Sequence, residues 1–410
     1  MAPTPPSRDR VRPDAAAAIA SAPAVTRNLR LRGAAPRVAI IHYWLVGMRG
    51  GEKVLEALLR MFPEADIFTH AYDPDAVSPL IRARKVTTTS VGRLPFATRM
   101  YQKYLPLMPR ALEEIDLTGY DLVLSSEAGP AKGVIAPPDT PHVCYCHSPM
   151  RYLWDQYHVY RDSAGLVTRA MLPRLAHRLR EWDVTSAARV DQFVANSTHV
   201  AARIEKYWRR PSTVVHPPVH VDDFAPLAAE ARGEFYLWVG ELAPYKRPDL
   251  AVEAFTQMGK PLYVIGGPKA TEKKLAARAG DNIRFLGKLP FDEMRRYMAS
   301  AKALIFPGEE DFGIVPVEVM ASGRPVIAYG RGGALDTVVD RETGLLFYEQ
   351  SIDAMIDAVE TFEAEQLADL DPMALVAHAR RFDEAAFRCG LGEVLRAQGI
   401  PLRAAEAKAG

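Results

Sequence analysis

The sequence is poor in cysteine, with only 3 among its 410 residues: Cys144, Cys146 and Cys389. An odd and sparse set gives no disulfide framework and suits a reducing compartment. Cys144 and Cys146 stand two residues apart on an expected strand beside His142 and His147. That spacing is not usual zinc geometry, so no metal site is expected.

Long apolar runs are also missing. No stretch of about 18 apolar residues occurs, so no segment is expected to span a membrane. Residues 1–36 are rich in Pro, Ala and Arg but lack the apolar segment of a signal peptide, so we expect a disordered arm there. Residues 401–410 are expected to fray. We therefore expect a cytoplasmic protein.

The chain has no excess of one charge, since 51 basic and 50 acidic residues give a formal net charge of +1. This balance argues against a protein built to bind nucleic acid, and no nucleic-acid partner is expected. No internal repeat of roughly 20 to 50 residues is visible, which argues against a solenoid.

Short apolar strands that alternate with helical segments dominate what is present. A glycine-containing loop with Gly50 and Gly51 follows the first strand, and a strongly helical pattern starts at Glu52. Strands that alternate with helices predict an α/β fold with doubly wound parallel sheets. In the first half we expect strands at 38–41, 122–126, 143–146 and 192–195.

A second alternating series begins after the adjacent prolines Pro217 and Pro218, which favour a stiff extended connection. Its strands are expected at 235–239, 262–265, 283–286, 303–306 and 325–328. We predict an N-terminal domain at 37–215, a linker at 216–232, and a C-terminal domain at 233–385. The helix over 386–400 is a candidate to return to the N-terminal domain.

The segment 307–325 carries the most chemical information. An acidic loop follows a strand, and a short helix is expected from near Gly313 to Gly323, with Pro316 in its first turn. The free N–H groups of Ile314 and Val315 then face the loop and suit a diphosphate.

Two carboxylates flank this expected anion site. Glu310 lies in the loop and Glu318 in the helix. A carboxylate beside a phosphate is costly unless it accepts hydrogen bonds, and sugar or ribose hydroxyls are suitable donors. The alternative is that both are solvated surface acids.

Glu310 and Glu318, with seven residues between them, match the Glu-x7-Glu signature of retaining glycosyltransferase family 4. Residues 312–318, 321–327 and 328–347 are similar to that family as well, and the resemblance covers 37–395. It implies the GT-B fold, in which two Rossmann-like domains face a cleft. The C-terminal domain would bind the nucleotide and the N-terminal domain the acceptor.

The resemblance also implies roles for individual residues. Glu318 would hold the ribose hydroxyls, and Glu310 would contact the transferred sugar. Lys246 would neutralise the leaving phosphate, where negative charge develops. Further donor contacts are expected from Arg247, Gly287, Asp311, Phe312, Gly313, Ile314 and Val315. One departure is Glu241, because the family usually has an arginine there and a carboxylate cannot take over its phosphate contact.

In the first domain, Gly50 and Gly51 resemble the family's first glycine loop, although a plain tight turn is the alternative. His147 follows the strand 143–146 and matches the family's histidine at the cleft. The resemblance implies that it steers the donor sugar, and we assign His147, Glu310 and Lys246 as the catalytic residues. A purely structural histidine is the alternative.

Basic and aromatic residues alternate between 81 and 110, which suits the interface of an anionic membrane. We therefore expect Arg93, Arg99, Lys103 and Arg151 to meet a membrane or a polyprenyl-diphosphate-linked glycan acceptor. The alternative is an amphipathic helix packed on the sheet.

Residues 147–155 and 245–250 are similar to bacterial mannosyltransferases that build O-antigen and exopolysaccharide from GDP-mannose. The expected function is retaining transfer of mannose, with no cofactor beyond the nucleotide sugar, at the cytoplasmic face of the inner membrane. Two alternatives stay open: a transferase that uses a UDP-sugar, and a catalytically weak nucleotide-sugar-binding scaffold.

Overall fold

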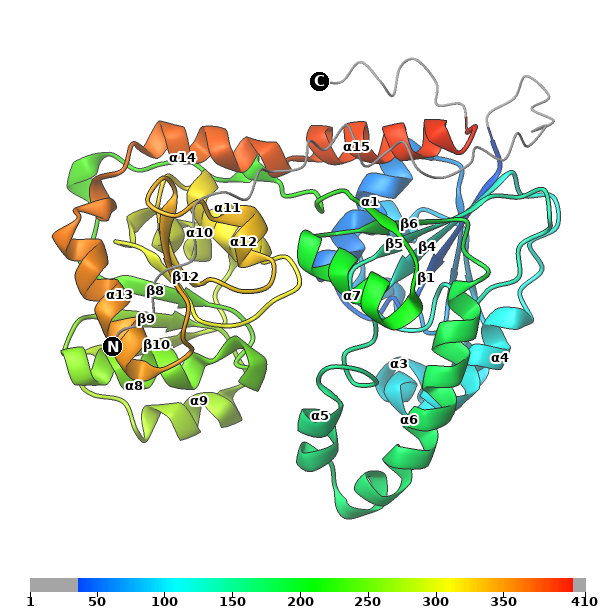
Figure 1. The fold of residues 1–410 in the computed structure, drawn as a ribbon, viewed down its shortest axis with the longest axis horizontal. Helices are drawn as coiled ribbons and strands as arrows, with labels where there is room; N and C mark the ends of the chain where they lie inside the picture. The colour runs from blue at the N-terminus through cyan, green and yellow to red at the C-terminus, as the bar shows by residue number, and fades with distance from the viewer. Residues whose placement is uncertain (1–35, 401–410) are drawn as a thin grey trace, which may run out of the picture.

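The computed structural model describes residues 36–400, which form two parallel-sheet α/β domains side by side (Figure 1). The doubly wound α/β fold expected from the sequence is confirmed. The arm predicted at 1–36, apart from Pro36, and the tail at 401–410 lie outside the described residues. Within the described part, no helix has both the length and the apolar character needed to cross a membrane.

The N-terminal domain is built on a 7-stranded sheet in the order β3-β2-β1-β4-β5-β6-β7, and every pairing is parallel. The order reverses between β1 and β4, and in open α/β sheets ligands bind at such a point. The strands are β1 (Val38–His42), β2 (Asp66–Thr69), β3 (Val86–Thr88), β4 (Leu122–Glu127), β5 (His142–Cys146), β6 (Gln192–Ala195) and β7 (Ser212–Val214).

The C-terminal domain has a 6-stranded parallel sheet in the order β10-β9-β8-β11-β12-β13, with its reversal between β8 and β11. Its strands are β8 (Tyr236–Val239), β9 (Leu262–Ile265), β10 (Ile283–Gly287), β11 (Leu304–Phe306), β12 (Val326–Tyr329) and β13 (Gly344–Phe347).

Helices cover both faces of each sheet (Figure 1), and the central strands are buried along their whole length, as expected for parallel sheets. All five residues of β1 and all five of β5 are buried. The helices of the first domain are α1 (Gly50–Met61), α2 (Pro79–Arg82), α3 (Ala97–Met100), α4 (Met108–Glu113), α5 (Tyr157–Ser163), α6 (Leu166–Ala187) and α7 (Thr198–Trp208). Those that follow are α8 (Pro248–Met258), α9 (Lys269–Ala276), α10 (Phe291–Ser300), α11 (Ile314–Ala321), α12 (Ala334–Thr337), α13 (Ile352–Ala364), α14 (Pro372–Ala379) and α15 (Glu384–Ala397).

The last helix crosses from the second domain to the first (Figure 1). Asp383 caps α15 by accepting a hydrogen bond from the Ala386 N–H at 2.7 Å. The ring of Phe387 then packs on Tyr145 of β5, with 5.5 Å between centroids, inside the core of the first domain. The connection between the domains is shorter than the expected linker 216–232, because Val219, Val221 and Phe224 belong to the core of the second domain.

Candidate active site

The acidic loop after β11 lies directly against the loop that carries Lys246. A Cβ atom on Gly308 would lie 2.7 Å from the Lys246 Cα, so only glycine allows the two loops to meet there. The Lys246 Nζ donates to the Glu310 Oε1 at 2.8 Å. Burial disfavours the charged ammonium, but the attraction of Glu310 outweighs it and the pKa of Lys246 is raised. The chain therefore places a cation and a carboxylate together just before α11.

Glu318 lies within α11 and is buried. Burial raises the pKa of its carboxyl, because few charges compensate for the loss of water. The nearest cation is Lys53 in the first turn of α1, whose Nζ lies 3.9 Å from the Glu318 Oε1. Since α1 belongs to the other domain, this pair connects the two domains. Sequence analysis missed Lys53, although its place in the first turn after the glycine loop was a usable signal.

Asp311 joins the two domains through its side chain. Its Oδ2 accepts from the Arg151 Nε at 2.9 Å, and its Oδ1 accepts from the Arg203 Nη1 at 2.6 Å. Burial opposes ionisation, but the two arginines outweigh it and lower the pKa of Asp311. The sequence predicted a donor contact for Asp311, but it did not predict this link between domains.

Arg203 was not among the candidates from the sequence. It lies in α7 three residues after Val200 and one before Ile204, on the apolar face of that helix. A charged residue in that register is buried only when it has partners, which was the available signal. Arg151, predicted for the acceptor or the membrane, is also mostly buried and bonded to Asp311, so it lies between the two domains and not on a lipid-facing surface.

A series of polar side chains leads from His147 through Ser126 and His42 to Glu52. The His147 Nε2 lies 2.8 Å from the Ser126 Oγ, which lies 3.1 Å from the His42 Nδ1. The His42 Nε2 faces the Glu52 Oε1 at 3.7 Å. These residues come from the ends of β5, β4 and β1, which are neighbours in the sheet, and from the first turn of α1.

Burial and neighbouring charges determine the protonation of His147 and Glu52. Burial, together with the nearby His42, lowers the pKa of His147 to about 3, so its ring is neutral at physiological pH. Burial opposes the ionisation of Glu52, but the nearby His42 and the hydrogen bond from the Arg49 N–H at 2.9 Å prevail and lower its pKa. A neutral imidazole can donate at one nitrogen and accept at the other, so His147 can orient a hydroxyl without adding charge.

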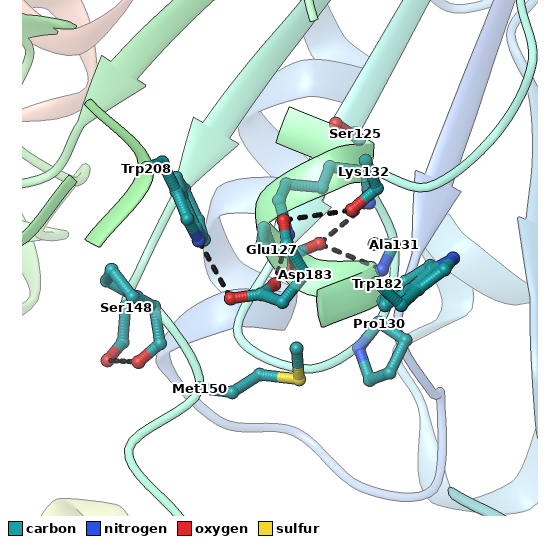
Figure 2. Close-up of polar contacts among 12 residues, drawn as sticks. Ser125, Glu127, Pro130, Ala131, Lys132, Ser148, Met150, Trp182, Asp183 and Trp208 are labelled. Carbon is teal, nitrogen blue, oxygen red and sulfur yellow. Dashed lines mark hydrogen bonds and ion pairs between the residues drawn. The ribbon is translucent and has the colours of Figure 1, made fainter. Parts of the chain in front are cut away.

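A buried ionic cluster holds the segment that leads from His147 to α6 (Figure 2). Lys132 is completely buried and pairs with Asp183 of α6 and with Glu127, whose Oε1 lies 3.4 Å from the Nζ. The Asp183 Oδ2 also accepts from the Trp154 Nε1 at 2.8 Å and the Trp208 Nε1 at 2.7 Å. Trp154 is thereby fixed three residues after Arg151.

The remaining residues predicted to contact the donor or the membrane are spread over several elements of the two domains. Gly50 lies at the domain interface, where an added Cβ would be 3.0 Å from the Ile314 Cδ1. Arg247 bonds to Asp249 and, at 3.0 Å, to the Gln350 Oε1. It is therefore already engaged within its own domain, and its phosphate contact stays a prediction. Gly51 lies within α1, Gly287 ends β10, Phe312 is buried and Gly313 caps α11. The exposed Arg93, Arg99 and Lys103 lie on short helical turns.

Two family models match the chain in succession. The family described as Glycosyltransferase Family 4 matches residues 48–223, and the one described as Glycosyl transferases group 1 matches residues 222–386. Together they cover residues 48–386, which hold most of both α/β domains and the site residues described above except His42.

Curated relatives are similar over part of their length. The D-inositol 3-phosphate glycosyltransferase of Acidothermus cellulolyticus is 32% identical over 240 residues, which are 49% of this chain and 52% of the relative. The protein of the same name from Kribbella flavida is 30% identical over 239 residues, 50% of this chain and 56% of the relative. The chain thus matches about half the length of these relatives.

Solved structures share the fold at low identity. Anabaena HepE in complex with UDP and glucose superposes with a TM-score of 0.62 at 15% identity, covering 88% of this chain and 99% of HepE. WaaG, a glycosyltransferase involved in lipopolysaccharide biosynthesis, gives 0.60 at 17% identity, covering 88% of this chain and 100% of WaaG. At such identities the likeness shows the architecture alone.

Proposed function

Because this chain belongs to glycosyltransferase family 4 and has the GT-B fold, we propose that it transfers a hexose from a nucleotide diphosphate to a glycan acceptor with retention of configuration. Lys246 and Glu310, paired at 2.8 Å in front of α11, carry this proposal. The helix N-terminus and the ammonium suit a diphosphate, and the carboxylate suits a sugar hydroxyl.

The proposed reaction keeps its charges and protons in balance. The bond from the anomeric carbon to the phosphate oxygen breaks while the acceptor oxygen bonds to the same face of that carbon. The acceptor hydroxyl gives its proton to the departing diphosphate. Lys246 stabilises the charge that develops on the leaving group, and no metal ion or other cofactor is needed.

The proposed donor is GDP-mannose, on the similarity of residues 147–155 and 245–250 to bacterial mannosyltransferases. A UDP-sugar is the second candidate, because the related HepE structure holds UDP and glucose. Incubation with GDP-mannose, UDP-glucose and UDP-N-acetylglucosamine, with nucleotide release as the readout, separates them. Release from none of these donors would favour the scaffold alternative and defeat the proposal.

The proposed acceptor is a polyprenyl-diphosphate-linked glycan, reached by a cytoplasmic protein in peripheral contact with the inner membrane. A phosphorylated inositol is the competing acceptor, because the curated relatives carry the name D-inositol 3-phosphate glycosyltransferase. Transfer of labelled sugar to each acceptor distinguishes the two.

A pair of adjacent acids tests the site assignment. Glu310→Ala should lower turnover by a factor of about 100 or more, because Glu310 would contact the reacting sugar. Glu309→Ala is the matched control, since Glu309 is the neighbouring acid and faces Arg331 at 3.3 Å instead. A fully active Glu310→Ala enzyme would refute the assignment.

A further inference from the structure

The first two turns of α6 are exposed on all sides and carry large apolar side chains. Leu166 is 86% exposed, Val167 74% and Met171 65%. Every residue from 165 to 171 is exposed. Soluble proteins seldom leave several large apolar side chains together in water without a partner, so this tip requires an explanation.

The same helix has two apolar stripes. Residues 172, 175, 176 and 179 pack inward against the core of the first domain. At 3.6 residues per turn, the exposed positions 166, 167, 170 and 171 centre roughly 160° away from them. One stripe therefore stabilises the fold, and the other is not needed for it.

Basic side chains follow the exposed apolar stripe toward the C-terminal end of α6. Arg174 and Arg178 are exposed and lie one and two turns beyond the apolar tip, on its side of the helix. Among residues 36–400, neither forms an ion pair with a carboxylate. An apolar tip followed by unpaired guanidinium groups matches an anionic membrane, whose headgroups lie above its hydrocarbon.

The C-terminal part of α6 is held in the first domain by buried polar contacts of Asp183. Asp183 is buried in the ionic cluster with Lys132, and Trp208 donates to it (Figure 2). Trp154 donates to the same carboxylate. At 1.5 Å per residue the tip lies about 25 Å from this anchor. Together α5 and α6 project from the first domain as a hairpin (Figure 1).

We propose that the α6 tip, formed by Leu166, Val167 and Met171 with Arg174 and Arg178 behind it, inserts into the surface of an anionic lipid bilayer. This inference deepens the proposed function, since it assigns the surface through which the enzyme reaches a lipid-linked acceptor. Insertion of a tip fits the common depth of interfacial helices, about 5–10 Å into the headgroup boundary. A second copy of the chain is the poorer occupant, because three apolar side chains at a helix tip offer much less than the roughly 1,200 Å² that a stable protein interface buries.

The proposal gives residues 81–110, which were expected to meet a membrane, an auxiliary role in lipid binding. Their Leu105 packs against the same core cluster as Leu172 and Leu175 of α6, so the two segments share one core. In the proposed arrangement, Arg93, Arg99 and Lys103 add attraction to the lipid while the α6 tip supplies the insertion.

Vesicle sedimentation tests the inference. The full chain should bind vesicles of phosphatidylcholine with phosphatidylglycerol more tightly than vesicles of phosphatidylcholine alone. The triple variant L166S/V167S/M171S should weaken this binding at least about tenfold. R174E/R178E should weaken it too, and R93Q/R99Q/K103Q should do so less strongly than the tip variant. Tyr348→Ser with Met373→Ser, at exposed apolar positions of the other domain, should leave it unchanged.

Two readouts keep the inference separate from the proposed function. Donor hydrolysis without vesicles should be equal in wild type and the tip variant, which shows that the variant is folded and competent. Sedimentation velocity should show the same oligomeric state in both. Unchanged vesicle binding by the tip variant, no binding by wild type, or loss of an oligomer in the tip variant would each overturn the proposal.

Discussion

The carboxylate of Asp311 in the second domain lies 2.6 Å from the Arg203 Nη1 in the first. The same carboxylate holds Arg151, and the guanidinium of Arg151 lies over the ring of Tyr245, 5.1 Å from its centroid. The acid that follows the proposed sugar-contacting Glu310 therefore helps to hold the domains together, alongside Asp336, whose carboxylate accepts from the N–H and the hydroxyl of Thr198 at 2.7 and 2.6 Å.

Replacing this acid should open the cleft. Asp311→Asn removes the carboxylate that pairs with the buried Arg151, while Arg203 keeps Asp155 as a partner. An uncompensated buried charge such as that of Arg151 is strongly unfavourable. We expect the two domains to separate, with a larger radius of gyration by small-angle X-ray scattering. Transfer should fall by a factor of about 10 to 100, because the reacting groups are no longer held together.

Glu253→Gln is the control for this variant, since Glu253 lies in α8 of the second domain and pairs with Arg278 of the same domain at 3.4 Å. It should change neither property. An Asp311→Asn protein with an unchanged radius and rate would show that other contacts hold the domains.

The sequence predicted those features of the site that lie within one segment. Glu310, Glu318 and the helix between Gly313 and Gly323 belong to a single strand, loop and helix, so spacing alone places them. The pair Lys53–Glu318 and the bonds of Asp311 to Arg203 join residues more than a hundred positions apart. They depend on how the domains close, which no local pattern encodes.

The polar contacts from His147 to Ser126 and His42 could not be predicted from the sequence for a related reason. Ser126 is the residue before the last of β4, and His42 ends β1. In the sequence, Ser126 ended an expected strand and His42 directly followed one. Only the strand order 1-4-5 brings them beside His147 at the end of β5. Strand order in a doubly wound sheet is set by packing of the whole domain, so the sequence indicated the ends but not their neighbours.

Replacing Glu241 tests how a carboxylate at the position of the family's usual arginine affects donor binding. It follows β8, and its charge is among those that raise the pKa of Lys246. Glu241→Gln removes a negative charge that opposes the incoming diphosphate. The donor KM should fall about threefold at low salt, and the effect should shrink at high salt.

Steady-state kinetics at two salt concentrations measure this change. Glu234→Gln is the matched control, because Glu234 precedes β8 at the opposite edge of the sheet. A donor KM that rises in Glu241→Gln would instead mean that the carboxylate contributes to donor binding.

Buried histidines should make the protein less stable in acid. Burial lowers the pKa of His142 to about 4 in the folded protein, against a usual value near 6.5. Below that usual value the unfolded chain takes up a proton that the folded state refuses, so stability falls as the pH drops from 6.5 toward 4. Between pH 7.5 and 5.0 this one group should reduce the free energy of unfolding by about 2 kcal/mol.

Urea unfolding of wild type and His142→Gln at both pH values checks this expectation. The variant is less stable at pH 7.5 because it loses the hydrogen bond to Ser125 at 2.8 Å, but its further loss at pH 5.0 should be smaller. His177→Gln, at an exposed position of α6, should lose as much as wild type. Equal losses in wild type and His142→Gln would contradict the assignment.

The polar chain below His147 predicts which of its ring nitrogens carries the proton. Glu52 is ionised and can only accept, so it favours a proton on the Nε2 of His42. The His42 Nδ1 then accepts from the Ser126 hydroxyl, and the Ser126 oxygen accepts from the His147 Nε2–H. His147 is left with a lone pair on Nδ1, suited to accept a hydrogen bond from a hydroxyl.

Nitrogen-15 NMR of labelled histidine can observe this directly, with the His147 signals assigned from their loss in His147→Gln. In wild type the His147 Nδ1 should have the shift of an unprotonated nitrogen. Glu52→Gln provides an amide that can donate to His42, so the chain can reverse and the proton of His147 can move to Nδ1. Transfer should slow in this variant, while Glu56→Gln, one turn further along α1, should match wild type. A protonated Nδ1 in the wild-type enzyme would show that the chain runs in the opposite direction.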